Sequence, residues 1–166
     1  MKKIARAIDY LNEIIGKITS YIVYVLLLVV VYEVIRRKVF NSPTMWGFEL
    51  SYMLYAVMFL MGLGYTLKHN MHIGIDVFYS KLNHRLQGIL DLITFFIFFL
   101  PFTLIAIKSS WIFMLQSWQI MEHSQSPWAP AIYPFKTFMP VAFFLLFLQG
   151  ISNVIKSYYK IKGEEI

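Results

Sequence analysis

The sequence contains no cysteine, which excludes disulfide bonds, thiolate metal sites and cysteine nucleophiles. Charged residues are also scarce, at 14% of the 166 residues, whereas ordinary soluble domains have about 25%. The chain has no Gly-rich phosphate loop, no catalytic-triad spacing and no paired catalytic carboxylates. We therefore expect no enzyme, and we predict no catalytic residue, no cofactor and no metal site.

Hydrophobic residues are abundant instead, at 58% of the chain, and they gather into four long apolar stretches. Each stretch is about as long as a helix needs to cross ~30 Å of hydrocarbon. Because lipid offers no partner for a free N–H or C=O, the spans should be helical. We predict an all-α integral membrane protein, a single four-helix domain over residues 1–166 whose spans cover about Ile14–Ile35, Phe48–Leu67, Ile89–Ile107 and Phe135–Ile155.

The residues before the first span have the pattern of an amphipathic helix. Ile4, Ile8, Leu11 and Ile15 repeat at i, i+4, i+7 and i+11, and polar residues occupy the other positions. This pattern predicts an interfacial helix that lies flat on the membrane surface before the chain turns in.

The net charge of +6 does not indicate nucleic-acid binding, because the basic residues stand beside the span ends, where they meet lipid headgroups. Counted on alternate sides of the four spans, ten Lys and Arg fall with the termini and five fall on the other side. The positive-inside rule then places both termini in the cytoplasm. The five opposite residues are Arg36, Arg37, Lys38, Lys108 and Lys136.

Ionisable side chains are missing near the middle of every span, although transporters normally keep such groups for ions or substrate. Glu33 lies at a span end, where Arg36 and Arg37 at i+3 and i+4 can pair with it. All four histidines fall in connectors, which disfavours haem ligation inside the bundle. This pattern favours an accessory or scaffold subunit over a self-sufficient transporter.

The second span carries small residues that let another helix approach closely. Gly47, Ser51, Gly62 and Gly64 are therefore candidates for packing against a partner helix, together with Glu49 in the first helical turns. Packing within the chain is the alternative interpretation.

Two outer segments are further candidates for contacts. Arg36, Arg37 and Lys38 form a basic cluster on the side where the positive-inside rule does not require it, so we expect it to bind lipid phosphates or a docking protein. The alternative is a snorkelling cluster that Glu33 partly neutralises. The loop Ser126–Pro130 (SPWAP) should be rigid and extended, and its Pro127, Trp128 and Pro130 are candidates for periplasmic contacts.

Several segments, taken in order, resemble the small membrane subunit, DctQ-like, of the tripartite ATP-independent periplasmic (TRAP) transporters. They are Ser42–Tyr52 (SPTMWGFELSY), Gly62–Leu67 (GLGYTL), His72–Val77 (HIGIDV) and the SPWAP loop. The resemblance covers nearly the whole chain. It implies a bacterial inner-membrane location and two partners: a large, DctM-like membrane subunit and a periplasmic, DctP-like substrate-binding protein.

The resemblance also implies that the large subunit carries the sodium and substrate sites and moves an organic acid by an elevator motion. The acid could be a C4-dicarboxylate, a sialic acid, a sulfonate or similar. The small subunit would widen the fixed scaffold. Two other classes stay open from the residues alone: another accessory subunit such as a redox-enzyme anchor, and a small multidrug transporter, which would need a carboxylate deep in its first span.

Overall fold

The computed structural model describes residues 1–69, 79 and 82–163. Within that part of the chain, four helical stretches are long and apolar enough to cross a membrane. They contain the four spans expected from the sequence, which confirms the all-α membrane fold. Their bounds are Lys2–Lys38, Gly47–Lys68, His84–Gln119 and Tyr133–Lys162.

The first stretch consists of α1 (Lys2–Ser20) and α2 (Ile22–Lys38), which meet at Tyr21. Tyr21 lies seven residues after the expected start of the span at Ile14. The N-terminal helix that the amphipathic pattern predicted is α1, and it packs against α3 (Gly47–Lys68) and α8 (Phe138–Lys162). Its position at the membrane surface stays a prediction. The hydroxyls of Thr19 and Ser20 bond to carbonyls of the preceding turn, an arrangement that favours bends in helices.

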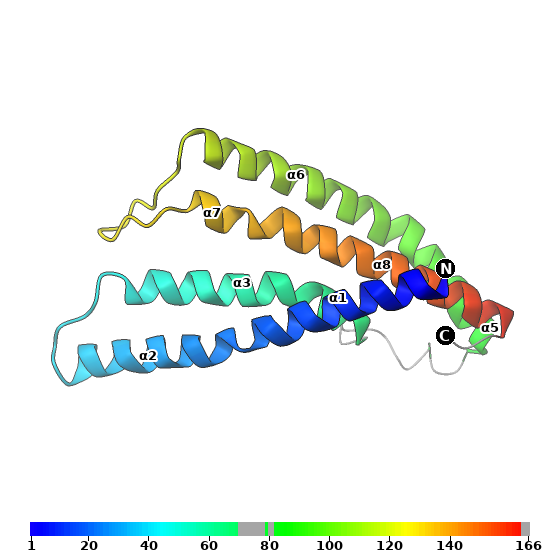
Figure 1. Cartoon of the computed structure of the whole chain (residues 1–166), viewed down its shortest axis with the longest axis horizontal. Coiled ribbons are helices and arrows are strands. Elements are labelled where there is room, and N and C mark those ends of the chain that lie inside the picture. The colour runs from blue at the N-terminus through cyan, green and yellow to red at the C-terminus, as the bar shows by residue number, and fades with distance from the viewer. Residues whose placement is uncertain (70–78, 80–81, 164–166) are drawn as a thin grey trace.

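Helix α8 lies between the others and packs against α1, α3, α5 (His84–Thr94) and α6 (Leu100–Gln119) (Figure 1), and among the described helices it contributes the largest share of the buried residues. Its buried residues are small or polar more often than they are large and apolar, which suits close packing in a setting without a hydrophobic drive between helices. The buried residues of α8 are Pro140, Ala142, Leu145, Leu146, Gln149, Gly150, Ser152 and Ser157.

The third stretch combines α5, a π-helical turn η1 (Phe95–Phe99) and α6. Pro101 lies in the first turn of α6, and its missing N–H removes one hydrogen bond from the helix. The structure accommodates the proline beside a π-helical turn, in which the N–H of Leu100 bonds to the carbonyl of Phe95. Gly150 of α8 faces this turn, and a Cβ there would lie 2.2 Å from the Phe99 ring.

The chain termini and two of the helix connections lie at opposite ends of the bundle. Both termini lie at one end, whereas the α2–α3 and α6–α7 connections lie at the other, where α7 (Tyr133–Lys136) leads into α8 (Figure 1). This arrangement agrees with an even number of crossings. The His72–Val77 motif lies outside the described residues.

Candidate functional site

Glu33 ties the end of α2 to the start of α3. Its carboxylate is largely buried and accepts hydrogen bonds from the hydroxyl and N–H of Thr44. Arg37 Nη2 lies 3.0 Å from Glu33 Oε1, which confirms the expected i,i+4 pair. Arg36 instead donates to Ser42 Oγ at 3.0 Å. The connection between the two helices is therefore fixed by a charged group and its neighbours.

Two residues of the basic cluster Arg36, Arg37 and Lys38 have exposed side chains. The Arg37 side chain is 58% exposed despite its pairing with Glu33, and Lys38 is exposed as well. Arg36 is half-buried. One carboxylate faces three cations here, so this end of α2 keeps an excess of positive charge.

The small residues of α3 do not share one environment. Gly47 is buried, and a Cβ there would lie 2.7 Å from Glu33 Oε2, while the Ser51 hydroxyl bonds to the Gly47 carbonyl in its own helix. Gly64 is also buried, because Asn12 of α1 occupies the space beside it. Gly62 differs, since a Cβ there would meet no atom within 4 Å. Of the two neighbouring glycines, Gly62 alone faces open space.

Glu49 and the outer loop, predicted separately, lie together in the structure. Ser126 Oγ donates a hydrogen bond to the Glu49 carboxylate, which joins the first turn of α3 to the SPWAP segment. The segment is compact rather than fully extended, because Ala129 has a positive φ of 48° and its N–H bonds back to Ser126. Pro127 and Trp128 remain exposed, and Pro130 is half-buried.

A buried polar cluster that the sequence analysis missed links α1 to α8. Gln149 is fully buried; it accepts a hydrogen bond from Asn12 Nδ2 at 2.9 Å and donates to Asp9 Oδ1 at 2.8 Å. Ser152 also donates to Asp9, and Lys156 Nζ lies 2.7 Å from the other Asp9 oxygen. The carboxylate is thus neutralised and hydrogen-bonded within the chain, as a charge held inside a bundle must be.

The spacing of these residues was a detectable feature. On α8, Gln149, Ser152 and Lys156 follow one another at i, i+3 and i+7, and on α1 Asp9 and Asn12 are three apart, so each set occupies one helix face. An apolar span with a polar line on one face indicates a polar partner line on a neighbouring helix.

Two ionisable groups in the segments that connect the spans, Glu122 and Tyr79, have shifted pKa values. Lys136 Nζ lies 2.5 Å from Glu122 Oε2, and its hydrogen bond holds the pKa of the Glu122 carboxyl below its ordinary value. Burial raises the pKa of Tyr79, as does the hydrogen bond from its hydroxyl to Asp91 of α5. Both contacts tie a connecting segment to a residue 12 to 14 positions away.

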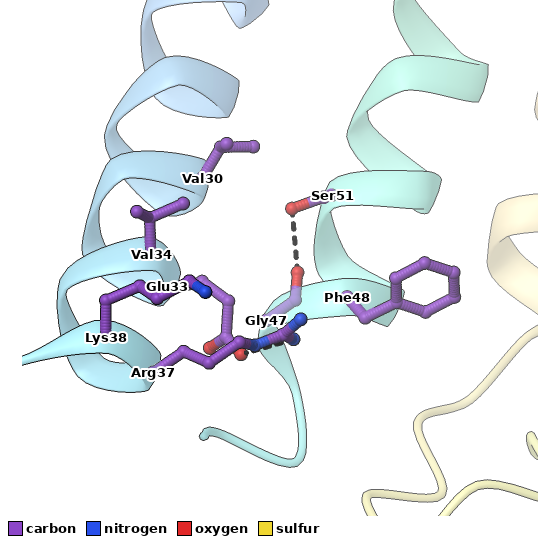
Figure 2. Close-up of a pocket in the computed structure, with 8 residues that line it drawn as sticks. All are labelled: Val30, Glu33, Val34, Arg37, Lys38, Gly47, Phe48 and Ser51. Atoms are coloured by element: carbon purple, nitrogen blue, oxygen red, sulfur yellow. Dashed lines mark hydrogen bonds and ion pairs between the residues drawn. The ribbon is translucent and has the colours of Figure 1, made fainter. Parts of the chain in front are cut away.

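Two grooves of about 320 Å³ each lie beside α3. The first, between the ends of α2 and α3, brings together the small residues Gly47 and Ser51 and the cations Arg37 and Lys38 (Figure 2). The second lies at the α1–α2 junction and includes Gly16 and Gly62. Among the described residues, no group of three or more His, Asp or Glu side chains is placed to hold a metal ion.

Comparison with known proteins gives a consistent result. A family model described as tripartite ATP-independent periplasmic transporters, DctQ component, matches residues 26–158. The sialic acid TRAP transporter small permease protein SiaQ of Vibrio cholerae serotype O1 is 31% identical over 85 residues, which are 51% of this chain and 47% of that protein. The C4-dicarboxylate TRAP transporter small permease protein DctQ of the same organism is 30% identical over 79 residues, 48% of this chain and 34% of that protein. The aligned parts thus span about half of the first relative and a third of the second.

Proposed function

This chain belongs to the family of DctQ components of the TRAP transporters, and from that membership we propose that it supports a large membrane subunit without carrying substrate itself. The large, DctM-like subunit would hold the sodium and substrate sites. A periplasmic, DctP-like binding protein would deliver an organic acid to it. The two relatives are named as subunits of a sialic acid transporter and of a C4-dicarboxylate transporter, which is why we propose an organic acid as the substrate class.

The observation that supports the scaffold role is that the buried polar groups of the α1–α8 cluster bond to one another. Asp9, the charged centre of the α1–α8 cluster, is saturated by Gln149, Ser152 and Lys156. A transport site needs polar groups that exchange partners with ion or substrate, whereas these groups satisfy one another. Such an arrangement stabilises a bundle and leaves it without a vacant site at this cluster.

The outer faces of the bundle support the need for a partner. Of the 17 residues of α2, only Glu33 is buried, and most of its large apolar side chains are exposed. These faces contact lipid or another apolar protein surface once the chain is in a membrane. We propose that the large subunit covers part of them, and that the open groove beside Gly62 is one place where its helix approaches closely.

We also propose the orientation of the subunit in the inner membrane. The two termini share one end of the bundle (Figure 1), and the majority of the basic residues fall at that end. The positive-inside rule then places both termini in the cytoplasm and the SPWAP loop in the periplasm. There, Glu49, Pro127, Trp128 and Pro130 would be within reach of a transiently docking binding protein.

Co-purification tests the proposed association. The chain carries an affinity tag and is expressed with a DctM-like large subunit from the same organism, and an equally tagged, unrelated four-span protein is the control. We expect the large subunit to elute with this chain in a fixed ratio through size-exclusion chromatography, and not with the control. Elution of the large subunit free of this chain in mild detergent would refute the scaffold role.

A further inference from the structure

The groove between α2 and α3 has one apolar wall and one wall nearly without side chains. Val30 and Val34 line it from α2, and Val30 projects toward α3 (Figure 2). On the α3 side, Ser51 is small and Gly47 lies against the Glu33 carboxylate, while the ring of Phe48 points away from α2 (Figure 2). The result is a groove of about 320 Å³ between the two helices that is open at the surface and apolar along Val30 and Val34.

The charges of the groove are confined to one end. Arg37 and Lys38 border it in the last turn of α2, at the end of the first candidate span. Glu33 faces the same end, but its carboxylate is engaged by Thr44 and Arg37. The mouth therefore presents a net positive charge at the level of the lipid headgroups.

The shape of the groove limits which ligand fits it. A free phosphate would use the cations and leave the apolar length empty, and an acidic peptide would have to bury polar backbone groups along Val30 and Val34. A molecule with one negative head and a hydrocarbon tail matches both parts. The cations also stand on the side where the positive-inside rule does not require them.

We propose that the α2–α3 groove is a binding site for one anionic phospholipid. The phosphate lies against Arg37 and Lys38, and one acyl chain follows Val30 and Val34 beside Ser51. Basic pockets between transmembrane helices hold lipid headgroups in this manner. The bound lipid fills a space that the chain leaves open next to the Glu33 network. Its binding does not depend on the large subunit, so the site is testable on the isolated chain.

Native mass spectrometry of the detergent-purified chain, titrated with phosphatidylglycerol, measures this binding. Lys38→Gln removes one cation, and we expect about a fivefold weaker affinity, the effect of one basic residue near a membrane surface. Lys3→Gln is the matched control, because it removes one exposed cation from α1. It should leave the affinity within a factor of two.

A second variant tests the part of the groove that would hold the acyl chain, without changing any charge. Ser51→Leu fills the α3 wall at a residue whose hydroxyl bonds only its own helix in this structure, and it should lower lipid retention at least tenfold. Ser109→Leu, at an exposed position of α6, is its control. The proposal is wrong if Lys38→Gln and Lys3→Gln weaken binding equally, if Ser51→Leu has no effect, or if glycerol phosphate displaces the lipid at equal concentration. In the last case the site holds a free anion only.

Discussion

Gln149 makes two of the buried polar contacts between α1 and α8. Its amide is fully buried, and it accepts a hydrogen bond from Asn12 and donates one to Asp9. A buried donor or acceptor that loses its partner costs about 1–3 kcal/mol. The stability of the bundle therefore depends strongly on this one residue.

Replacing Gln149 with leucine should lower the free energy of unfolding by about 2–4 kcal/mol, because Asn12 and Asp9 each lose a buried partner. Thermal unfolding in mild detergent, followed by circular dichroism, measures the effect. Gln116→Leu is the matched control, since Gln116 is exposed on α6. Equal melting temperatures for the two variants would contradict the role assigned to the cluster.

The Glu122–Lys136 contact makes a pH-dependent contribution at the opposite end of the bundle. The pKa of Glu122 is lowered in the folded chain, so its contribution is complete above the ordinary value of 4.5 and is lost as the pH falls through the lowered value. Glu122→Gln should therefore reduce the melting temperature slightly at pH 7 and make no difference near pH 2. A larger difference in acid than at neutral pH would show that the sign is wrong.

Single residues were predicted unevenly from the sequence. The Glu33–Arg37 pair follows from helical spacing and is confirmed. The contact between Glu49 and Ser126 joins residues 77 positions apart, and no local pattern contains it. The Asp9–Gln149 cluster was predictable in part. The sequence shows a line of polar residues on each of the two helices, but it does not show that these two helices pack against each other.

At the scale of helices, the type of each element was predictable and its boundaries were less so. Hydrophobic length identified the four spans, and the amphipathic pattern identified the helix before Tyr21. The packing of that helix depends on tertiary contacts that the pattern does not contain: α1 buries Ala5, Asn12 and Gly16 against its neighbours and leaves Ile4 and Leu11 exposed. The π-helical turn before Pro101 had no feature in the sequence beyond the proline itself.

Two glycines of α3 should respond differently to the same substitution. Gly62→Leu adds a side chain in open space and should leave folding intact but weaken association with the large subunit by about fivefold to tenfold, the size of a close helix contact in membranes. Gly64→Leu collides with Asn12, so it should lower thermal stability of the isolated chain.

Quantitative co-purification and melting curves of both variants separate the two effects. Loss of association by Gly62→Leu without a change in melting temperature supports a partner helix at this groove. If Gly62→Leu associates normally, the large subunit lies elsewhere on the bundle.

At the scale of the whole molecule, cysteine labelling can test the proposal that both termini lie in the cytoplasm. Met45 in the α2–α3 connection is 72% exposed, and Asn83 before α5 is exposed at the other end. Because the chain has no cysteine, Met45→Cys and Asn83→Cys introduce unique labelling sites. An impermeant maleimide added to spheroplasts should label Met45→Cys directly and Asn83→Cys only after permeabilisation. The reverse pattern would invert the subunit and move the lipid groove to the cytoplasmic leaflet.

Sodium-driven uptake in proteoliposomes tests the central claim, that this chain supports transport without performing it. Labelled sialic acid or C4-dicarboxylate is offered to liposomes that contain this chain alone, the large subunit with the binding protein, or all three. We expect uptake only from the complete set. Uptake by the chain alone would contradict its role as a scaffold, and full uptake without the chain would show that the large subunit does not need it.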